Sequence, residues 1–252
     1  MLHLTRKHQP ETLKDLVLSP EARKYLELWF DEGKYLRNSI LLYGGPGTGK
    51  TTIRRMIMKR TDVELKYHSF DNEYEGLKKK SGKPNVSDII SHMTGSLYGG
   101  VFDFIGGSSK PTYIFLDEIG LIEPREYFDI KSHMDKVEEA GIDVEFILAS
   151  NPLPEGRIPK QLDSRLGVKL GMDFATWNPD TNKVAYHLGM TKSIYLEELK
   201  RVIYRITERE GVKEIDDKLI EETVKKNPQA IPHVRDMMNR LQTAYELKIS
   251  GK

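Results

Sequence analysis

The chain has 252 residues, of which 31% are charged and 38% hydrophobic, with 39 Lys and Arg against 38 Asp and Glu. This length and apolar content predict one large domain or two smaller ones, with a buried core. The net charge of +1 gives no overall attraction to nucleic acid or membrane, so any polyanion contact must be local. The lack of cysteine excludes disulfides, a thiol catalyst and a cysteine zinc site. No apolar run approaches about 18 residues and the N-terminus is polar, which predicts a soluble intracellular protein without a membrane span or secretory signal.

Short apolar runs alternate with helix-length amphipathic segments over the first two thirds of the chain. Continuous apolar runs are typical of parallel strands that are covered on both faces. In chain order, the predicted strands are residues 39–43, 63–70, 112–116, 144–149 and 167–170. The predicted helices are residues 20–32, 50–60, 87–97 and 125–140. This order predicts an α/β domain with a doubly wound, five-stranded parallel sheet.

The pattern changes after about residue 172. Segments 194–210, 215–226 and 231–247 carry apolar residues at helical spacing, with no strand between them. They predict a small three-helix domain, which divides the chain into domains 1–172 and 173–252. Residues 173–190 fit a linker with a short hairpin.

The sharpest local motif is the segment GGPGTGKT, Gly44 to Thr51, between a predicted strand and a predicted helix. It matches the phosphate-binding pattern G-x-x-x-x-G-K-[ST] in the context that this pattern requires. Glycines permit a positive φ, so that successive N–H groups point at a phosphate, and the helix adds its positive dipole end. We expect Lys50 to reach the β- and γ-phosphates of ATP, as a catalytic residue, and Thr51 to ligate Mg²⁺. The residues of this segment expected to bind ATP are Gly45, Pro46, Gly47, Thr48, Gly49, Lys50, Thr51 and Thr52.

Polar residues follow two of the later strands. Asp117 and Glu118 come after strand 112–116, and we expect Asp117 to support Mg²⁺ and Glu118 to polarise an attacking water. The alternative for this pair is a solvated acidic turn. Asn151 follows strand 144–149, where ligands of doubly wound sheets gather, and we expect it beside the γ-phosphate as a catalytic residue. Its alternative role is that of a turn residue before Pro152.

The order of these motifs, followed by Ser164-Arg165 and an arginine in the helical region, resembles that of the AAA+ ATPases. The opening KHQPETLKDLV, residues 7–17, is similar to that of replication factor C small subunits. Residues 224–241 resemble the sensor 2 region of phage clamp loaders. As a whole, the chain looks like the ATPase subunits of T-even-type bacteriophage clamp loaders. The resemblance implies that Arg165 acts in trans on a neighbour's ATP and that Arg235 is the sensor 2 arginine. For Arg165 the alternative is an ion pair with Asp163 or another surface acid.

The same resemblance implies further contacts, for which ordinary surface or core packing is the alternative. The residues implied near the adenine and ribose are Thr5, Arg6, Lys7 and His8, with Val17 packed on the ring. The lysines implied near DNA phosphates are Lys78, Lys79, Lys80 and Lys83. The aromatic residues implied to contact a sliding clamp are Tyr98, Phe102 and Phe104.

The resemblance implies an ATP-driven clamp-loader subunit that uses ATP and Mg²⁺ to open a sliding clamp and load it on primer-template DNA. It also implies other clamp-loader subunits as partners, in a pentamer, and the cytoplasm as location, that of an infected host for a phage protein engaged in viral DNA replication. The chain departs from the family at Gln9 and Leu166, and we expect the family's collar domain to be absent. The alternatives are another AAA+ remodelling ATPase or helicase loader, or an ATP-dependent binding module without turnover.

Overall fold

The structure, a computed structural model, describes residues 8–30, 39–71, 85–98, 110–151, 158–187 and 189–251. Contacts group the chain into two compact units. The sheet unit comprises Lys34–Tyr43 and Arg54–Leu170, and the loop–lid unit comprises Met1–Gly33, Gly44–Ile53 and Gly171–Lys252. The division into consecutive domains 1–172 and 173–252 stays a prediction.

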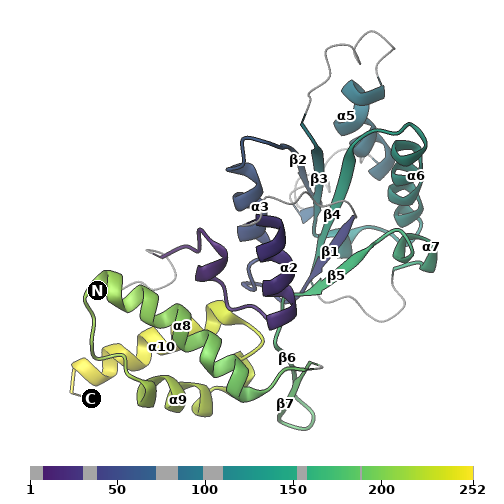
Figure 1. Cartoon of the computed structure of the whole chain (residues 1–252). Helices are drawn as coiled ribbons and strands as arrows, with labels where there is room; N and C mark the ends of the chain where they lie inside the picture. The colour runs from purple at the N-terminus through teal and green to yellow at the C-terminus, as the bar shows by residue number, and fades with distance from the viewer. Residues whose placement is uncertain are drawn as a thin grey trace, which may run out of the picture. The chain divides into compact units, whose positions relative to one another are not determined.

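A five-stranded parallel sheet forms the centre of the sheet unit, with the strand order β2-β3-β4-β1-β5 (Figure 1). The strands are β1 (Ile40–Tyr43), β2 (Glu64–Ser69), β3 (Thr112–Asp117), β4 (Val144–Ser150) and β5 (Val168–Gly171). Each bound lies within one residue of its predicted position. The predicted α/β fold class with a five-stranded sheet is therefore confirmed.

Helices cover both faces of this sheet. They include α3 (Lys50–Met58), α5 (Val86–Tyr98), η4 (Ile119–Leu121), α6 (Glu126–Glu139) and α7 (Lys160–Asp163). On the face of α5 and α6, Ile90 and Ile130 join Leu116 of β3 in one buried cluster (Figure 1). Tyr67 of β2 points to the other face, where the guanidinium of Arg54 lies 3.9 Å from its ring centre. Burial on both faces explains why the strands are continuously apolar.

The register brings the carboxyl ends of the central strands to one edge of the sheet. Tyr43 pairs with Ser150, and Ser69 pairs with Asp117. Because β3 and β4 are parallel neighbours, their carboxyl ends and the residues that follow lie side by side at this edge. This register places Asp117 and Asn151 at one edge of the sheet unit.

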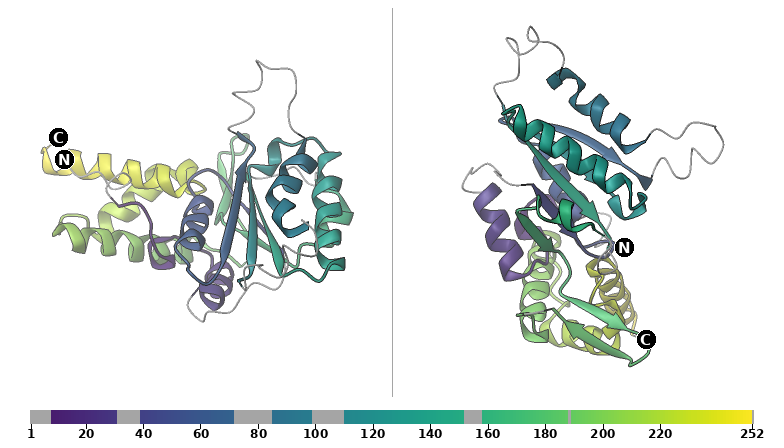
Figure 2. Two further views of the ribbon diagram at one scale, coloured as in Figure 1. Left: turned by 90° about the horizontal axis from the view of Figure 1, so that it is seen from above. Right: turned by 90° about the vertical axis from the view of Figure 1, so that its right-hand side faces the viewer.

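The loop–lid unit is mainly helical. Its elements are η1 (Leu13–Asp15), α2 (Pro20–Phe30), an antiparallel hairpin of β6 (Ala175–Asn178) and β7 (Lys183–Tyr186), α8 (Lys192–Glu210), α9 (Asp217–Lys226), η5 (Pro228–Ala230) and α10 (Val234–Ile249) (Figure 2). The hairpin interpretation of residues 173–190 is confirmed. The hairpin segment and the helices α8, α9 and α10 together form the lid. Their side chains share one core, the lid core, which includes Phe174, Tyr195, Ile220 and Met237.

Capping residues set where these helices begin and end. Thr191 accepts a hydrogen bond from the Ile194 N–H, so α8 begins two residues before its predicted start. Asp216 accepts one from the Leu219 N–H, so α9 begins after it. Gly211, with a φ of 66°, ends α8 in the left-handed conformation. None of the helices in the described ranges is both long and apolar enough to cross a membrane.

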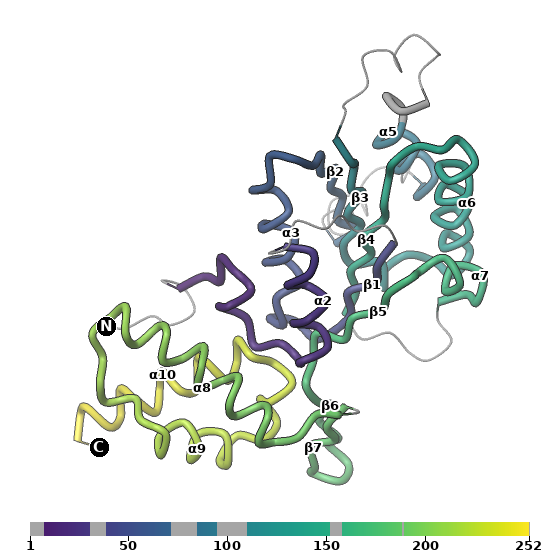
Figure 3. Tube along the Cα trace, in the orientation of Figure 1, coloured from purple at the N-terminus to yellow at the C-terminus, as the bar shows by residue number. Residues whose placement is uncertain are grey.

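The N-terminal segment around η1 lies next to helix α8 of the lid (Figure 3), and arginine side chains attach the two. Arg201 of α8 donates to the carbonyl oxygens of Lys14 and Leu16, the second at 2.7 Å. Arg23 of α2 donates to the same Leu16 oxygen at 3.1 Å. Val17, the next residue, is buried in the lid core. Residues from both ends of the chain therefore form one folded body.

Glu145 of the central strand β4 carries a carboxyl group with a perturbed pKa. Burial, helped by the nearby charges of Asp143 and Glu138, raises this pKa to about 7. The Ser39 hydroxyl opposes the shift by donating to Oε2 at 3.1 Å, while its oxygen accepts the Phe146 N–H. The ionised form is therefore costly inside the folded chain.

This cost predicts a pH-dependent effect of Glu145→Gln, which keeps the hydrogen bond to Ser39 but removes the titrating group. The folded carboxyl keeps its proton up to about pH 7, whereas the unfolded one loses it near its ordinary pKa of 4.5. Wild-type stability therefore falls as the pH rises through that window. We expect the variant to be more stable by about 1–2 kcal/mol at about pH 8, less than the full shift because the side chain is partly solvated, and equal to wild type at about pH 4. Urea denaturation at both pH values measures this, and exposed Glu139→Gln is the control. A gain of the same size at both pH values contradicts the assignment.

Candidate nucleotide-binding site

The loop from Gly44 to Gly49 joins β1 directly to α3. Gly44, Gly47 and Gly49 have φ values of 153°, 81° and 109°, which only glycine adopts without strain. The Thr48 hydroxyl donates to the Gly45 carbonyl at 2.9 Å. Helix α3 begins at Lys50, so its first-turn N–H groups follow the loop, as an anion site requires.

Lys50 is buried although it is charged. Its ammonium group donates to the carbonyl oxygens of Gly44 and Gly45, the second at 3.0 Å. A phosphate offers this group stronger, charged acceptors than two carbonyls. The ammonium group of Lys50 is therefore positioned to bind an anion in the loop.

Two residues near the start of α10 lie against the loop glycines. A side-chain carbon on Gly47 would lie 2.7 Å from the Cβ of Arg235, and one on Gly45 would lie 2.8 Å from the imidazole of His233. Such distances exclude any side chain unless something moves. The predicted sensor 2 arginine is thus next to the phosphate-binding loop in the loop–lid unit.

The N-terminal segment contacts the same loop. A side-chain carbon on Gly49 would lie 2.9 Å from Leu16 Cδ2. Val17, expected on the adenine ring, packs in the lid core. His8, expected near the base, has its Nε2 atom 2.9 Å from Glu210 Oε1. Thr5, Arg6 and Lys7 lie outside the described residues, so their adenine contacts stay predictions.

The structure brings three predicted residues together at the edge of the sheet unit. Asp117 is buried at the end of β3, and its Oδ1 accepts the Glu118 N–H at 3.0 Å. Asn151 Nδ2 donates to Glu118 Oε2 at 3.0 Å. Glu118 has a φ of 56°, a left-handed conformation that is uncommon for a residue with a side chain. This backbone and the Asn151 amide together fix the direction of the Glu118 carboxylate.

Arg165 is paired within its own chain. Its guanidinium lies 2.7 Å from Asp135 and 2.6 Å from Glu138, both on α6. Asp163, the partner considered from the sequence, pairs with Lys169 instead. In the single chain, Arg165 thus forms ion pairs with surface acids, as the alternative expected. Its role in trans stays a prediction.

The residues expected to contact DNA and a sliding clamp are not tested by the structure. The side chain of Tyr98, the last residue of α5, is outside what the structure describes. The others lie outside the described ranges: Lys78, Lys79, Lys80, Lys83, Phe102 and Phe104.

Two residues of the site were not singled out from the sequence, Asp173 and His233. Both carboxylate oxygens of Asp173 lie close to the Gly45 nitrogen, at 2.9 and 2.8 Å. Burial raises the pKa of Asp173, and the Gly45 hydrogen bond with the charges of Lys50 and the nearby histidines opposes that shift. A signal was present, because an acid just after a strand is the same pattern that identified Asp117. Nothing local marks His233.

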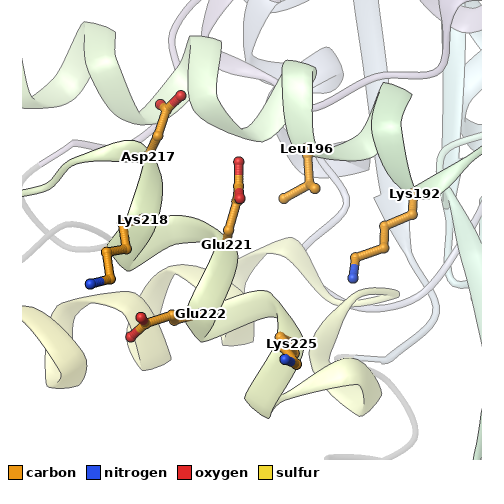
Figure 4. Close-up of a pocket in the computed structure, with 7 residues that line it drawn as sticks. All are labelled: Lys192, Leu196, Asp217, Lys218, Glu221, Glu222 and Lys225. Carbon is orange, nitrogen blue, oxygen red and sulfur yellow. The ribbon is translucent and has the colours of Figure 1, made fainter.

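A groove of about 530 Å³ lies on the lid between α8 and α9 (Figure 4). Its lining residues are Lys192, Leu196, Asp217, Lys218, Glu221, Glu222 and Lys225. Lys200 neutralises two of the carboxylates, with ion pairs of 2.9 Å to Asp217 and 2.7 Å to Glu221. Charges of both signs are mixed along it, so it offers no surface of one sign to a charged ligand.

Comparison with known proteins identifies the class that this fold and loop define. The family model of the ATPase family associated with various cellular activities (AAA) matches residues 40–174, more than half of the chain. The chain therefore belongs to the AAA family.

The curated relatives include replication factor C large subunits. The replication factor C large subunit of Methanopyrus kandleri is 31% identical over 134 residues, 50% of this chain and 26% of the relative. The replication factor C large subunit of Sulfolobus acidocaldarius is 24% identical over 222 residues, 84% of this chain and 41% of the relative. The cell division control protein 48 homolog B of Arabidopsis thaliana is 29% identical over 123 residues, 46% and 17% respectively. The chain thus spans less than half the length of each.

Solved structures share the fold over nearly the whole chain. A mutant of Thermotoga maritima RuvB has a TM-score of 0.58 at 20% identity, covering 97% of this chain and 68% of that one. The Aeropyrum pernix Orc1 protein in complex with DNA has a TM-score of 0.56 at 16% identity, covering 97% and 64%. At these identities the likeness shows the fold alone.

The crowding at the loop predicts that Gly47→Ala is more damaging than Gly189→Ala. The two glycines have nearly the same φ, 81° and 78°, but only Gly47 has an atom within 4 Å of the added carbon. We expect Gly189→Ala to cost about 1–2 kcal/mol for its backbone alone. Gly47→Ala should cost a further 1–3 kcal/mol or so, because Arg235 must move. Urea denaturation compares the two, and equal losses contradict the contact with Arg235.

Proposed function

We propose that this chain is the ATP-hydrolysing subunit of a clamp loader that opens a sliding clamp and loads it on primer-template DNA. The observation that carries the ATPase part is the phosphate-binding loop, with buried Lys50 and with Arg235 and Leu16 against its glycines. The clamp-loading part is supported by the opening at residues 7–17 and by the replication factor C relatives.

In this proposal the loop N–H groups and Lys50 bind the ATP phosphates and neutralise their charge. The oxygens of Thr51 and Asp117 are the kind of ligand that Mg²⁺ prefers, and the ion supplies further charge neutralisation at the phosphates when bound. Glu118 accepts a proton from the attacking water while the water oxygen forms a bond to the γ-phosphorus. The bond from that phosphorus to the β–γ bridging oxygen breaks, and ADP leaves. Asn151 holds the Glu118 carboxylate in place for this transfer.

Two arginines complete the proposed site. Arg235, beside the loop, stabilises charge on the phosphates within the same chain. Arg165 does so on the ATP of a neighbouring subunit, for which a planar and permanently charged group is suited. For that, it must exchange Asp135 and Glu138 for a phosphate when subunits assemble.

The remaining contacts of the proposal follow the family resemblance. The lysines Lys78, Lys79, Lys80 and Lys83 bind DNA backbone without reading sequence. The aromatic residues Tyr98, Phe102 and Phe104 bind the clamp. Other clamp-loader subunits complete a pentamer.

A second candidate is another AAA machine that remodels proteins or nucleic acid, and the relative from the cell division control protein 48 group favours it. ATP turnover with and without primed DNA and a sliding clamp separates the two. Stimulation of turnover by both together supports clamp loading. A turnover rate that neither DNA nor the clamp changes rejects clamp loading and leaves the second candidate.

We expect Glu118→Gln to keep ATP affinity but to lower the turnover rate on the order of 10²-fold or more, because the amide cannot accept the proton from water. The comparison variant Lys50→Ala should instead abolish ATP affinity, because no other side chain of the loop is cationic. A titration with a fluorescent ATP analogue and a phosphate-release assay measure both. A Glu118→Gln turnover within a few-fold of wild type excludes Glu118 as the base.

We expect Arg165→Ala to bind ATP normally in each subunit and to lose stimulated hydrolysis in the assembly. Mixing Arg165→Ala with Glu118→Gln subunits should restore part of the activity, because some interfaces then pair an intact Arg165 with an intact Glu118. Phosphate release from the mixture measures this. Full activity of Arg165→Ala alone, without complementation, rejects the role in trans.

A further inference from the structure

Asp173 lies two residues beyond β5, where the chain leaves the sheet for the lid. Its carboxylate accepts the N–H of Gly45 through both oxygens. A side-chain carbon on Gly44 would lie 3.1 Å from Met172 Cβ and 3.2 Å from Asp173 Cγ. The phosphate-binding pattern leaves position 45 open to any residue. Glycine is needed at 45 in this chain because His233 and Asp173 fill the space beside it.

The peptide groups of Gly45 are held from both sides. Asp173 holds its N–H, while Lys50 and the Thr48 hydroxyl donate to its carbonyl oxygen, at 3.0 and 2.9 Å. The residue that Asp173 holds is thus the same residue whose carbonyl accepts from the phosphate-binding lysine. Gly45 therefore links the position of the linker to that of Lys50.

The charge of Asp173 is unfavourable for a loop that binds phosphate, since like charges repel. The cationic or titratable groups that face it are Lys50 of α3, His187 after β7 and His233 before α10. A half-buried carboxylate whose two oxygens share one N–H makes a charge-assisted attachment to it. This geometry assigns to the acid the task of holding the lid linker and the loop together.

We propose that Asp173 is a positioning residue that ties the lid to the phosphate-binding loop through Gly45 and thereby sets Lys50 and Arg235 for ATP. The proposal rests on the proposed ATP-binding function. Without the tie, the N-terminus of α10, which carries His233 and Arg235, is no longer fixed against the loop. The loss then appears as weaker ATP binding although no residue expected to contact ATP has changed.

The test uses three variants of the full chain. Asp173→Ala removes the acceptor, Asp173→Asn keeps the shape and one acceptor oxygen without the charge, and Asp180→Asn changes an exposed acid on the β6–β7 turn as a matched control. The first measurement is hydrogen exchange of the Gly45 amide without nucleotide. We expect faster exchange in Asp173→Ala and no change in Asp180→Asn. Unchanged exchange in Asp173→Ala overturns the tie, whatever the ATP affinity.

The second measurement is the affinity for Mg·ATP. We expect Asp173→Ala to weaken it about tenfold or more and Asp173→Asn by less, with the control equal to wild type. Wild type and Asp173→Asn should converge as the pH falls, because a protonated Asp173 has lost its charge too. Faster exchange of Gly45 with unchanged affinity in both Asp173 variants overturns the positioning role. A wild-type chain that binds no ATP instead rejects the proposed function, while the exchange measurement still decides the tie.

Discussion

The absence of side chains at the four glycines of the phosphate-binding loop, Gly44, Gly45, Gly47 and Gly49, is the constraint on which this molecule depends. Asp173, His233, Arg235 and Leu16 occupy the space that larger residues at these four positions would need. The glycines therefore serve two purposes: they shape an anion site, and they let a linker, a lid helix and the N-terminal segment approach its backbone. This second use makes the loop part of the lid body, although it follows a strand of the sheet.

The sheet unit supplies the acidic part of the proposed chemistry by a different principle. Its central strands are buried on both faces, so their ends are rigid supports for polar groups. Glu118 is fixed there by an unusual backbone conformation and by the Asn151 amide. A carboxylate that is already fixed in one orientation loses less conformational entropy when it binds the attacking water, which is the advantage of preorganisation. Arg165 is different, because its exposed ion pairs are weak and exchangeable.

The sequence predicted what depends on local pattern. The five strands, the loop at 44–51 and the Asp117–Glu118 pair were found because apolar periodicity and glycine spacing act over a few residues. The beginnings of α8 and α9 were misplaced by two residues, since the caps at Thr191 and Asp216 outweigh apolar spacing. The acids that bind Arg165, and the contacts of Asp173 and His233 with Gly45, join residues distant in sequence. No short-range pattern contains them.

The discontinuous make-up of the loop–lid unit has a consequence for how the chain acquires its structure. Synthesis runs from the N-terminus, and the sheet unit, which ends at Leu170, is complete before the lid segment has left the ribosome. Asp173, His233 and Arg235 emerge after the loop glycines by on the order of 10 s at ordinary elongation rates. Until then Gly44, Gly45 and Gly47 lack the neighbours that the later segment supplies. The nascent chain therefore exposes the complete sheet unit before the phosphate site has all its residues, and nucleotide can assist folding only after the lid segment has emerged.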